Sequence, residues 1–344
     1  MDDQRVAIIA LPAPPLRAPP AWARYDRRAT WTSFLPVTPD IFEGSEAYIA
    51  SSPGPVVTIG NFDGVHLGHQ ALVSAARQRA VATGGPSLAL TFSPLPREVL
   101  APARSAPRLQ TTPARVAALR RHGIDQVVVE RFDEALAARD PEWFADVVLR
   151  QRLGARAVIV GWNFRFGKDR RGDADLLRSL LDAPVESVDA VHHGQKPVSS
   201  SRIRTAIGAG EVRAAAALLG RPYALHGTVV HGHQRGRELG FPTANIAPET
   251  AVPANGVYAV TLRVGDEERA AVANLGVRPT FDAGPRSVEV HVLDFDADLY
   301  DQRVRVSFIE RIRGERKFQG RDALMDQIAR DVEATRAALG TSPS

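Results

Sequence analysis

Residues 56–69 read VVTIGNFDGVHLGH, and this stretch decides the fold of the first half of the chain. The β-branched run 56–59 predicts a buried strand, and a helix is expected over 67–82. Gly60 and Gly64 lie between these two elements and let the backbone approach a ligand closely. Because the first turn of a helix presents unpaired N–H groups and a positive dipole end, this junction favours an anion such as phosphate.

His66 and His69 stand three residues apart at this helix start, so they fall on one face. Two imidazoles there can donate hydrogen bonds to phosphate oxygens as charge builds on the α-phosphorus of a bound nucleotide. Such electrostatic stabilisation needs no covalent intermediate. The alternative is a pair of capped surface histidines on an ordinary turn. The position of the motif between a strand and a helix favours the catalytic interpretation.

Short β-branched runs alternate with helical stretches through the first part of the chain. This alternation is typical of a Rossmann-like α/β fold, in which a parallel sheet is covered by helices on both faces. In such sheets, ligands bind at the carboxyl ends of the strands. The strands are expected at 56–59, 88–92, 127–129 and 157–160, and the helices at 67–82, 113–121, 141–152, 173–182 and 211–219.

After Gly220 the pattern changes to short alternating segments separated by Gly, Pro and Asn, which predicts an antiparallel barrel or sandwich. A last amphipathic helix, with Leu324, Ile328 and Val332 at helical spacing, is expected to pack against it. The predicted strands are 224–231, 256–264, 269–275, 287–293 and 303–309, and the predicted domains are 41–220 and 221–340.

Residues 1–40 are rich in proline, which breaks every candidate helix or strand there. We expect a disordered tail, or an extension of the reading frame upstream of a native start near Val37.

The composition of the chain bounds the classes of function. With 344 residues, 44% of them hydrophobic, the chain can bury more than one core. Cysteine is absent, which excludes disulfides and thiolate chemistry and fits a reducing compartment. No apolar run approaches the roughly 20 residues that span a bilayer, and a net charge of +4 suits anionic ligands. We expect a cytoplasmic protein that binds small molecules, without nucleic-acid or membrane partners.

Two further segments of the first half carry candidate binding residues. The segment VSSSRIR ends at Arg204, and its serines can cap a helix while the arginine contacts a triphosphate. The loop GWNFRFGKDRRG at 161–172 follows a strand, so Asn163 can hydrogen bond to a nucleotide and Phe164 or Phe166 can stack on it. The alternative for these rings is packing in the core.

A second glycine-rich segment, residues 227–245, reads GTVVHGHQRGRELGFPTAN and is suited to holding phosphates through backbone N–H groups. Thr243 and Asn245 lie on the same side of an extended chain. Their oxygens are hard ligands that can complete a largely hydrated Mg²⁺ shell. The alternative is a hairpin with a prolyl edge. His231 and His233 have no evident third partner, so we do not expect a zinc site.

Residues 287–293 read SVEVHVL and alternate strictly, so Glu289 and His291 project to the face opposite the valines. On the outer face of a barrel this is ordinary solvent exposure. Over a bound nucleotide, Glu289 can accept the proton of a substrate hydroxyl during in-line transfer of the γ-phosphoryl group. The pattern alone leaves both interpretations open.

Taken in order, these motifs resemble those of the bacterial bifunctional riboflavin kinase/FMN adenylyltransferases, the FAD synthetases. In the first half the resemblance rests on residues 57–69, 91–96, 163–167 and 199–204, although Trp162 and Ser201 depart from the family pattern. It implies that His66 and His69 bind and polarise the ATP phosphates. It also implies ligand-binding roles for Gly60, Phe62, Asp63, Gly64, Thr91, Pro94, Asn163, Phe166, Ser200, Ser201 and Arg204.

In the second half the resemblance rests on G-x-x-x-G-R-x-L-G-x-P-T-x-N at 232–245, with 274–280, 288–291 and 313–318. It implies that Thr243 and Asn245 bind Mg²⁺ and phosphate, and that Glu289 is the base toward the 5′-hydroxyl of the ribityl chain. The further binding residues that it implies are Gly232, Gly236, Arg237, Gly240, Pro242, Asn274, Arg278, Arg313 and Phe318.

The resemblance covers residues 41–340. It implies a magnesium-dependent enzyme that phosphorylates riboflavin to FMN and then adenylylates FMN to FAD, with ATP as co-substrate of both steps. Another nucleotidyltransferase with an H-x-G-H motif, or a non-catalytic flavin sensor, is the alternative. The motifs leave the oligomeric state open.

Overall fold

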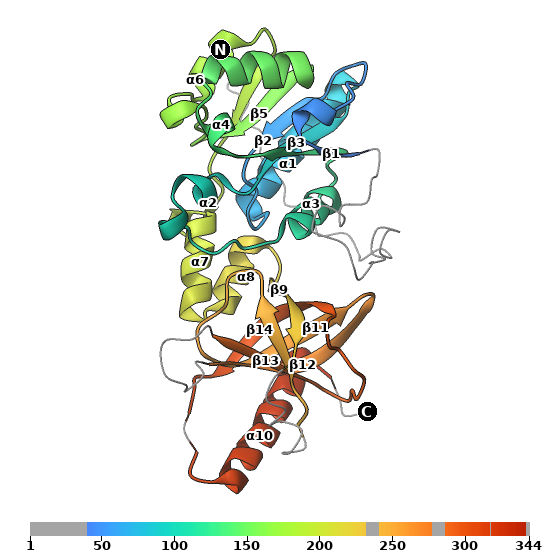
Figure 1. Cartoon of the computed structure of the whole chain (residues 1–344), viewed down its shortest axis with the longest axis vertical. Coiled ribbons are helices and arrows are strands. Elements are labelled where there is room, and N and C mark those ends of the chain that lie inside the picture. The colour runs from blue at the N-terminus through green and yellow to red at the C-terminus, as the bar shows by residue number, and fades with distance from the viewer. Residues whose placement is uncertain (1–39, 232–240, 277–285, 317, 342–344) are drawn as a thin grey trace.

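The computed structural model describes residues 40–231, 241–276, 286–316 and 318–341. Figure 1 shows an α/β body built from the first half and a barrel built from the second, with α7 (Ser200–Ala209) and α8 (Val212–Leu219) between them. The expected fold class, a Rossmann-like parallel sheet followed by an antiparallel barrel and a terminal helix, is confirmed.

The first half is built on a six-stranded sheet in the order β1-β4-β3-β2-β5-β6, in which every pair is parallel. From β2 the chain moves outward to β3 and β4, and then returns to the other side of β2 to form β5 and β6. This reversal creates a crevice at the carboxyl ends of β2 and β5, where open α/β sheets bind ligands. The strands are β1 (Ile41–Glu43), β2 (Val56–Ile59), β3 (Ser87–Ser93), β4 (Gln126–Arg131), β5 (Ala157–Gly161) and β6 (Val185–Val188).

Helices cover both faces of this sheet, because each buried strand sends alternate side chains to opposite faces. Val56 packs on one face against α1 (Leu67–Thr83) and α3 (Thr112–Arg121). Val57 packs on the other against the π-helical segment η5 (Phe144–Arg152), which continues α5 (Pro141–Trp143), and against α6 (Ala174–Leu180). Shorter elements are η3 (Ser45–Ala47), α2 (Pro96–Leu100), η4 (Pro102–Arg104), α4 (Glu134–Ala137), η6 (Lys168–Arg170), β7 (His192–His193) and β8 (Lys196–Pro197).

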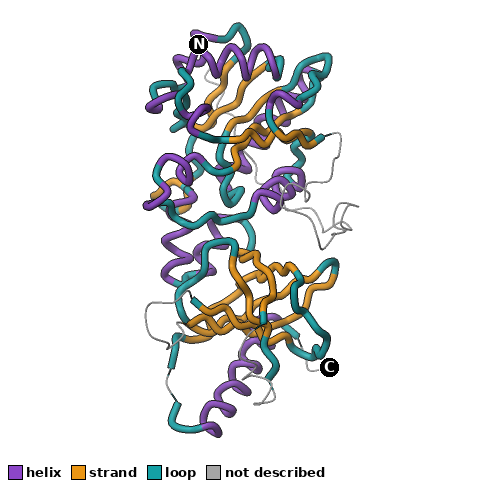
Figure 2. The backbone as a smooth tube through the Cα atoms, viewed as in Figure 1, coloured by secondary structure: helices purple, strands orange, loops and turns teal. Residues whose placement is uncertain are grey.

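The second half closes into a six-stranded antiparallel barrel, which Figure 2 shows in orange above the last helix. Its interior is filled by alternate strand residues such as Val288, Val290 and Phe308, and Ile203 and Leu219 of α7 and α8 join the same apolar cluster. The two halves therefore share a continuous core at the junction. The strands are β9 (Tyr223–Val230), β10 (Ala244–Pro248), β11 (Gly256–Val264), β12 (Glu267–Gly276), β13 (Ser287–Val292) and β14 (Arg303–Arg313).

The structure differs from the predicted elements at several strands and at one helix. The short edge strands β1 and β6 and the barrel strand β10 were not among the predicted strands, since their sequences carry few consecutive apolar residues. The helix expected over 141–152 widens into a π-helix from Phe144.

Within the described residues, no helix is both long and apolar enough to cross a membrane.

The terminal helix α10 (Arg321–Leu339) is anchored by an ion pair that its apolar pattern does not reveal. Asp331 is 3% exposed, and the guanidinium of Arg313 at the end of β14 donates to both of its carboxylate oxygens over 2.8 to 3.1 Å. The Arg313 guanidinium also lies 5.6 Å from the ring centroid of Phe318. Arg313 and Phe318, which the family resemblance placed among the ligand contacts, thus contact each other, and Arg313 also binds the helix.

We expect Asp331→Ala to loosen α10 selectively, because it leaves the Arg313 guanidinium largely buried without its counter-ion. The free energy of opening measured by amide hydrogen exchange in α10 should fall by about 3 kcal/mol, while exchange in α1 stays unchanged. The double variant Arg313→Met with Asp331→Leu removes both charges and should recover part of the loss. Unchanged protection of α10 in Asp331→Ala would contradict this role.

Candidate functional site

The loop after β2 has a strained backbone at the carboxyl end of that strand. Phe62 and Val65 have φ angles of 47° and 40°, in the left-handed region that non-glycine residues rarely adopt. Gly64 has a φ of 97°, and a Cβ at Gly60 would lie 3.2 Å from the Phe62 ring. Phe62 is 0% exposed, so its ring supports the loop from the protein interior. Strain of this kind persists only where the surroundings hold it, and it is concentrated at functional sites.

His66 and His69 meet at the start of α1, as the sequence predicts. His66 is the N-cap, and its Nδ1 accepts a hydrogen bond from the His69 backbone N–H at 3.3 Å. The two rings stack with centroids 3.6 Å apart and planes 15° from parallel. A neutral imidazole that accepts at Nδ1 carries its hydrogen on Nε2, so His66 presents an Nε2–H donor.

Burial keeps both imidazoles neutral at pH 7. It lowers the pKa of His66 from 6.5 to about 4, against the opposing charge of Asp63, and it lowers the pKa of His69 well below its ordinary value. The unfolded chain takes up the His66 proton near pH 6.5 but the folded protein only near pH 4. The contribution of this group to stability is therefore complete above pH 6.5 and is lost as the pH falls towards 4.

Asp63 joins the loop to the neighbouring segment at Leu109 and Gln110 through buried hydrogen bonds. It is 1% exposed, and its carboxylate accepts from the backbone N–H groups of Leu109 and Gln110 at 2.8 and 3.2 Å. Arg97 donates to it at 3.0 Å, and Arg204 forms a second ion pair with the same oxygen. Asp63 thus holds the guanidinium groups of Arg97 and Arg204 beside the crevice. These contacts occupy its own carboxylate oxygens.

The other residues predicted for this site take different positions. Ser200 donates its hydroxyl to the Asp63 carbonyl at 2.7 Å, whereas Ser201 is exposed on the first turn of α7. Asn163 is exposed in the loop after β5, next to the crevice. Phe166 is 8% exposed and stacks on Phe164 with centroids 5.3 Å apart, so its ring belongs to the core. Thr91 is buried, with its hydroxyl 3.3 Å from the Asn61 carbonyl, and Pro94 lines a cavity.

Two arginines that the sequence analysis did not single out hold the loop. Arg115 is 1% exposed and donates to the carbonyls of Asn61 and Phe92 at 3.1 and 2.7 Å. Arg221, at the junction of the two halves, donates to the carbonyls of Gly64 and Val65 at 2.7 and 3.2 Å. Burial lowers the pKa of each arginine to about 10, so both remain charged at neutral pH. No local sequence signal distinguishes them from surface arginines.

A second set of predicted residues forms a row across the outer face of the barrel. Asn245 of β10 lies opposite Glu289 of β13, and Glu289 lies opposite Asn274 of β12. Residues opposite each other on neighbouring strands point to the same face, and the flanking Val288 and Val290 fill the barrel interior. The barrel therefore brings one carboxylate and two amides together from strands that are distant in sequence.

His291, two residues after Glu289, fixes the segment that leads into β10. Its Nδ1 lies 2.8 Å from the Pro242 carbonyl, and its ring meets Phe241 edge to face with centroids 5.5 Å apart. Thr243 directly follows Phe241 and Pro242, the two residues that His291 contacts. His231 stacks on Tyr300 with centroids 4.0 Å apart. The predicted binding residues Gly232, Gly236, Arg237, Gly240 and Arg278 lie outside the described residues.

The donor set on the barrel fits magnesium rather than a softer metal. Among the described residues there is no group of three or more His, Asp or Glu side chains that could hold a metal ion unaided. Thr243 and Asn245 offer a hydroxyl and an amide oxygen, and Glu289 lies in register with Asn245. Magnesium takes oxygen ligands and keeps several waters or phosphate oxygens, so a sparse protein contribution is compatible with it.

Comparisons with known proteins point to one family for both halves. The family model of FAD synthetase matches residues 49–202, and that of riboflavin kinase matches residues 219–339. The chain is similar to bifunctional riboflavin kinase/FMN adenylyltransferases of Pseudomonas fluorescens (40% identical over 84% of this chain and 94% of the relative) and Escherichia coli strain K12 (37% over 86% and 96%).

A solved structure gives the same picture of the fold. A protein of Streptococcus pneumoniae, described as a macrolide-efflux protein, superposes with a TM-score of 0.76 at 32% identity, and the match covers 86% of this chain and 98% of that one.

We expect Arg221→Gln to raise the pKa of His66 above about 4. The substitution removes a positive charge that disfavours the imidazolium, and it also lets water reach the loop; both changes raise the pKa. Titration of the imidazole resonances by NMR measures the shift. Arg213→Gln is the matched control, since Arg213 pairs with Glu310 across the same junction at 2.5 Å without contacting the loop. An unchanged or lower pKa of His66 in Arg221→Gln would refute the assigned contact.

Proposed function

The chain belongs to the bifunctional riboflavin kinase/FMN adenylyltransferase family, and we propose that its two reactions occur at the two sites described above. The chain phosphorylates riboflavin to FMN with ATP and joins FMN to the AMP moiety of a second ATP, giving FAD and pyrophosphate. We assign adenylyl transfer to the loop after β2 and phosphoryl transfer to the outer face of the barrel.

At the first site, a phosphate oxygen of FMN attacks the α-phosphorus of ATP and pyrophosphate leaves. The Nε2–H of neutral His66 and the start of α1 donate to the oxygens on which charge develops. Arg204, held beside the crevice by Asp63, is placed to receive the leaving pyrophosphate. Asn163 and the hydroxyls of Ser200 and Ser201 complete the ligand contacts, while Phe62, Arg115 and Arg221 position the loop.

At the second site, Glu289 accepts the proton of the 5′-hydroxyl of riboflavin as that oxygen bonds to the γ-phosphorus and ADP leaves. Its neighbours Asn245 and Asn274 orient the substrates through amide hydrogen bonds. Thr243 and Asn245 would hold Mg²⁺, which supplies neutralisation of phosphate charge when bound. The glycine-rich segment 232–240 and Arg278 would bind the ATP phosphates, and the protein would act in the cytoplasm.

The observation that carries this proposal is the pairing of Asn245, Glu289 and Asn274 across three strands, in a body separate from the one that holds His66 and His69. Purified protein incubated with riboflavin, ATP and Mg²⁺ should form FMN first and FAD second. Flavin that binds without turnover would support a sensor instead.

The double variant His66→Ala with His69→Ala should stop FAD formation while FMN accumulates from riboflavin. Loss of the phosphate donors should slow adenylyl transfer by about a thousandfold, and the barrel site is untouched. Chromatographic quantification of both flavins measures the effect. His192→Ala with His193→Ala is the matched control, because this exposed pair lies on β7. If FMN formation falls equally, the two reactions are not divided as proposed.

Glu289→Ala should give the opposite phenotype. Removing a general base slows phosphorylation of riboflavin by about a hundredfold or more, whereas externally supplied FMN is still converted to FAD at the normal rate. Glu267→Ala, at an exposed position on β12, serves as the control for loss of a barrel carboxylate. Near-normal phosphorylation by Glu289→Ala would exclude this residue as the base.

A further inference from the structure

Gln70, in the first turn of α1, binds both the loop after β2 and the end of α8 with one side-chain amide. Its backbone N–H donates to the carbonyl of the N-cap His66 at 2.9 Å, and its side chain reaches back toward the start of the helix, as long helical side chains do. There its Nε2 donates to the carbonyls of Val65 and Leu219, at 2.9 Å each. One amide therefore connects the strained turn to a residue 149 positions later in the chain.

Arg221 completes the arrangement by binding the same two carbonyls. Its Nη1 donates to the Val65 carbonyl at 3.2 Å and to the Leu219 carbonyl at 3.3 Å. A carbonyl oxygen has two lone pairs, and the Gln70 amide has two N–H donors. Two nitrogens and two oxygens thus form a closed set of four hydrogen bonds, and neither carbonyl can turn away without breaking two of them.

The Leu219 carbonyl is available for this bridge because α8 ends there. The last carbonyls of a helix have no partner within the helix, and Gly220, with a φ of 71°, leads the chain out of it. A Cβ at Gly220 would lie 2.9 Å from the Leu67 side chain and 3.5 Å from the amide oxygen of Gln70. Glycine at this position therefore ends the helix and also leaves room for the bridge.

The helix α8 gives the bridge a fixed support, since it is packed on the barrel. Val212, Ala215 and Leu218 are buried in the apolar cluster that fills the barrel. On the same helix, Arg213 donates to Glu310 of β14 at 2.5 Å. The carbonyl before His66 is therefore held from outside the α/β body.

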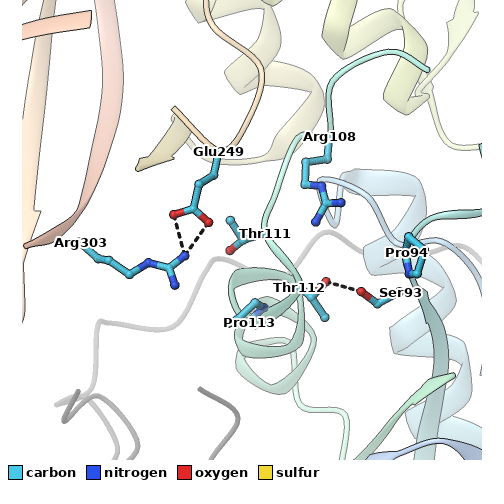
Figure 3. A pocket seen from close by; sticks show the side chains of 8 residues that line it. All are labelled: Ser93, Pro94, Arg108, Thr111, Thr112, Pro113, Glu249 and Arg303. Carbon is cyan, nitrogen blue, oxygen red and sulfur yellow. Dashed lines mark hydrogen bonds and ion pairs between the residues drawn. The ribbon is translucent and has the colours of Figure 1, made fainter. Parts of the chain in front are cut away.

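The polar pairs at the cavity between the halves do not make such a connection. This cavity has a volume of about 360 Å³. Figure 3 shows two pairs on its walls: the hydroxyls of Ser93 and Thr112 lie 3.0 Å apart, and Arg303 donates to both oxygens of Glu249. Each of these pairs forms within one half of the chain. The bridge from Gln70 instead joins the turn to the helix that is packed on the barrel.

We propose that Gln70 is a positioning residue for adenylyl transfer. Its amide, together with Arg221, fastens the Val65 carbonyl to the end of α8 and so keeps His66 in the N-cap orientation that presents its Nε2–H to the ligand. Val65 directly precedes His66, so a rotation of the Val65 peptide turns the imidazole. The inference rests on the assignment of adenylyl transfer to the loop after β2.

Steady-state kinetics of FAD formation from FMN and ATP test this role. Gln70→Met keeps the length of the side chain and removes both donors. It should lower kcat by about tenfold or more, since a small misplacement of a catalytic group is costly, and leave both KM values within about threefold. Phosphorylation of riboflavin should stay within about twofold of normal, because the barrel is unchanged. Gln78→Met, the same change at an exposed position of α1, is the matched control and should alter neither reaction.

Titration of His66 by NMR gives a readout that a loss of stability alone would not move. Glutamine and methionine are both uncharged, so Gln70→Met acts on the pKa of His66 by moving the ring or admitting water. Burial holds this pKa at about 4, and displacement of the ring should raise it toward its ordinary value of 6.5. A kcat within about twofold of normal, or an unchanged pKa of His66, would overturn the proposal.

Two further variants keep the outcomes distinct. If Gln70→Met does not fold, Gln70→Glu keeps the shape of the side chain, replaces the donor by an acceptor, and should show the same fall of kcat. If His66→Ala with His69→Ala retains FAD formation, the assignment of the site itself fails. If that double variant is inactive while Gln70→Met has a normal kcat, only the positioning role of Gln70 fails.

Discussion

The left-handed backbone of the turn between β2 and α1 is the constraint on which the first site depends. Phe62, Gly64 and Val65 all have positive φ angles there, a conformation that costs of order 1 to 3 kcal/mol for each non-glycine residue. The turn gives His66 its N-cap position and stacks it on His69. Without external support, this backbone would relax toward ordinary turns, and the histidines would lose their common orientation.

Support for the turn comes from the buried Arg115 and the half-buried Arg221, which both bind backbone carbonyls. Arg115 holds Asn61, and Arg221 holds Gly64 and Val65. These contacts satisfy carbonyls that no regular element pairs, and they also surround the histidines with positive charge. The same charges that disfavour the imidazolium favour a polyanionic ligand. One arrangement therefore keeps His66 a neutral donor and makes the surrounding potential favourable for an anion.

The barrel also holds its candidate site residues in a fixed arrangement, but it does so by a different means. Its closed sheet fixes Asn245, Glu289 and Asn274 in one row through backbone pairing alone, so the row needs no strained turn. The two halves meet through α7, α8 and Arg221, and their shared apolar core makes the junction continuous. This contact explains how residues of the barrel come to line a cavity beside the loop of the other half.

The sequence by itself determined the fold class of both halves and pointed to those candidate site residues whose motifs are local. The strand, turn and helix over 56–83 follow from neighbours in the chain, as does the alternation that points Glu289 outward. Only the tertiary structure decided which arginine holds which carbonyl, that Phe166 packs in the core, and that Arg313 pairs with Asp331. The reason is physical: periodicity and turn chemistry act over a few residues, whereas burial and ion pairing depend on segments that meet only after the chain has folded.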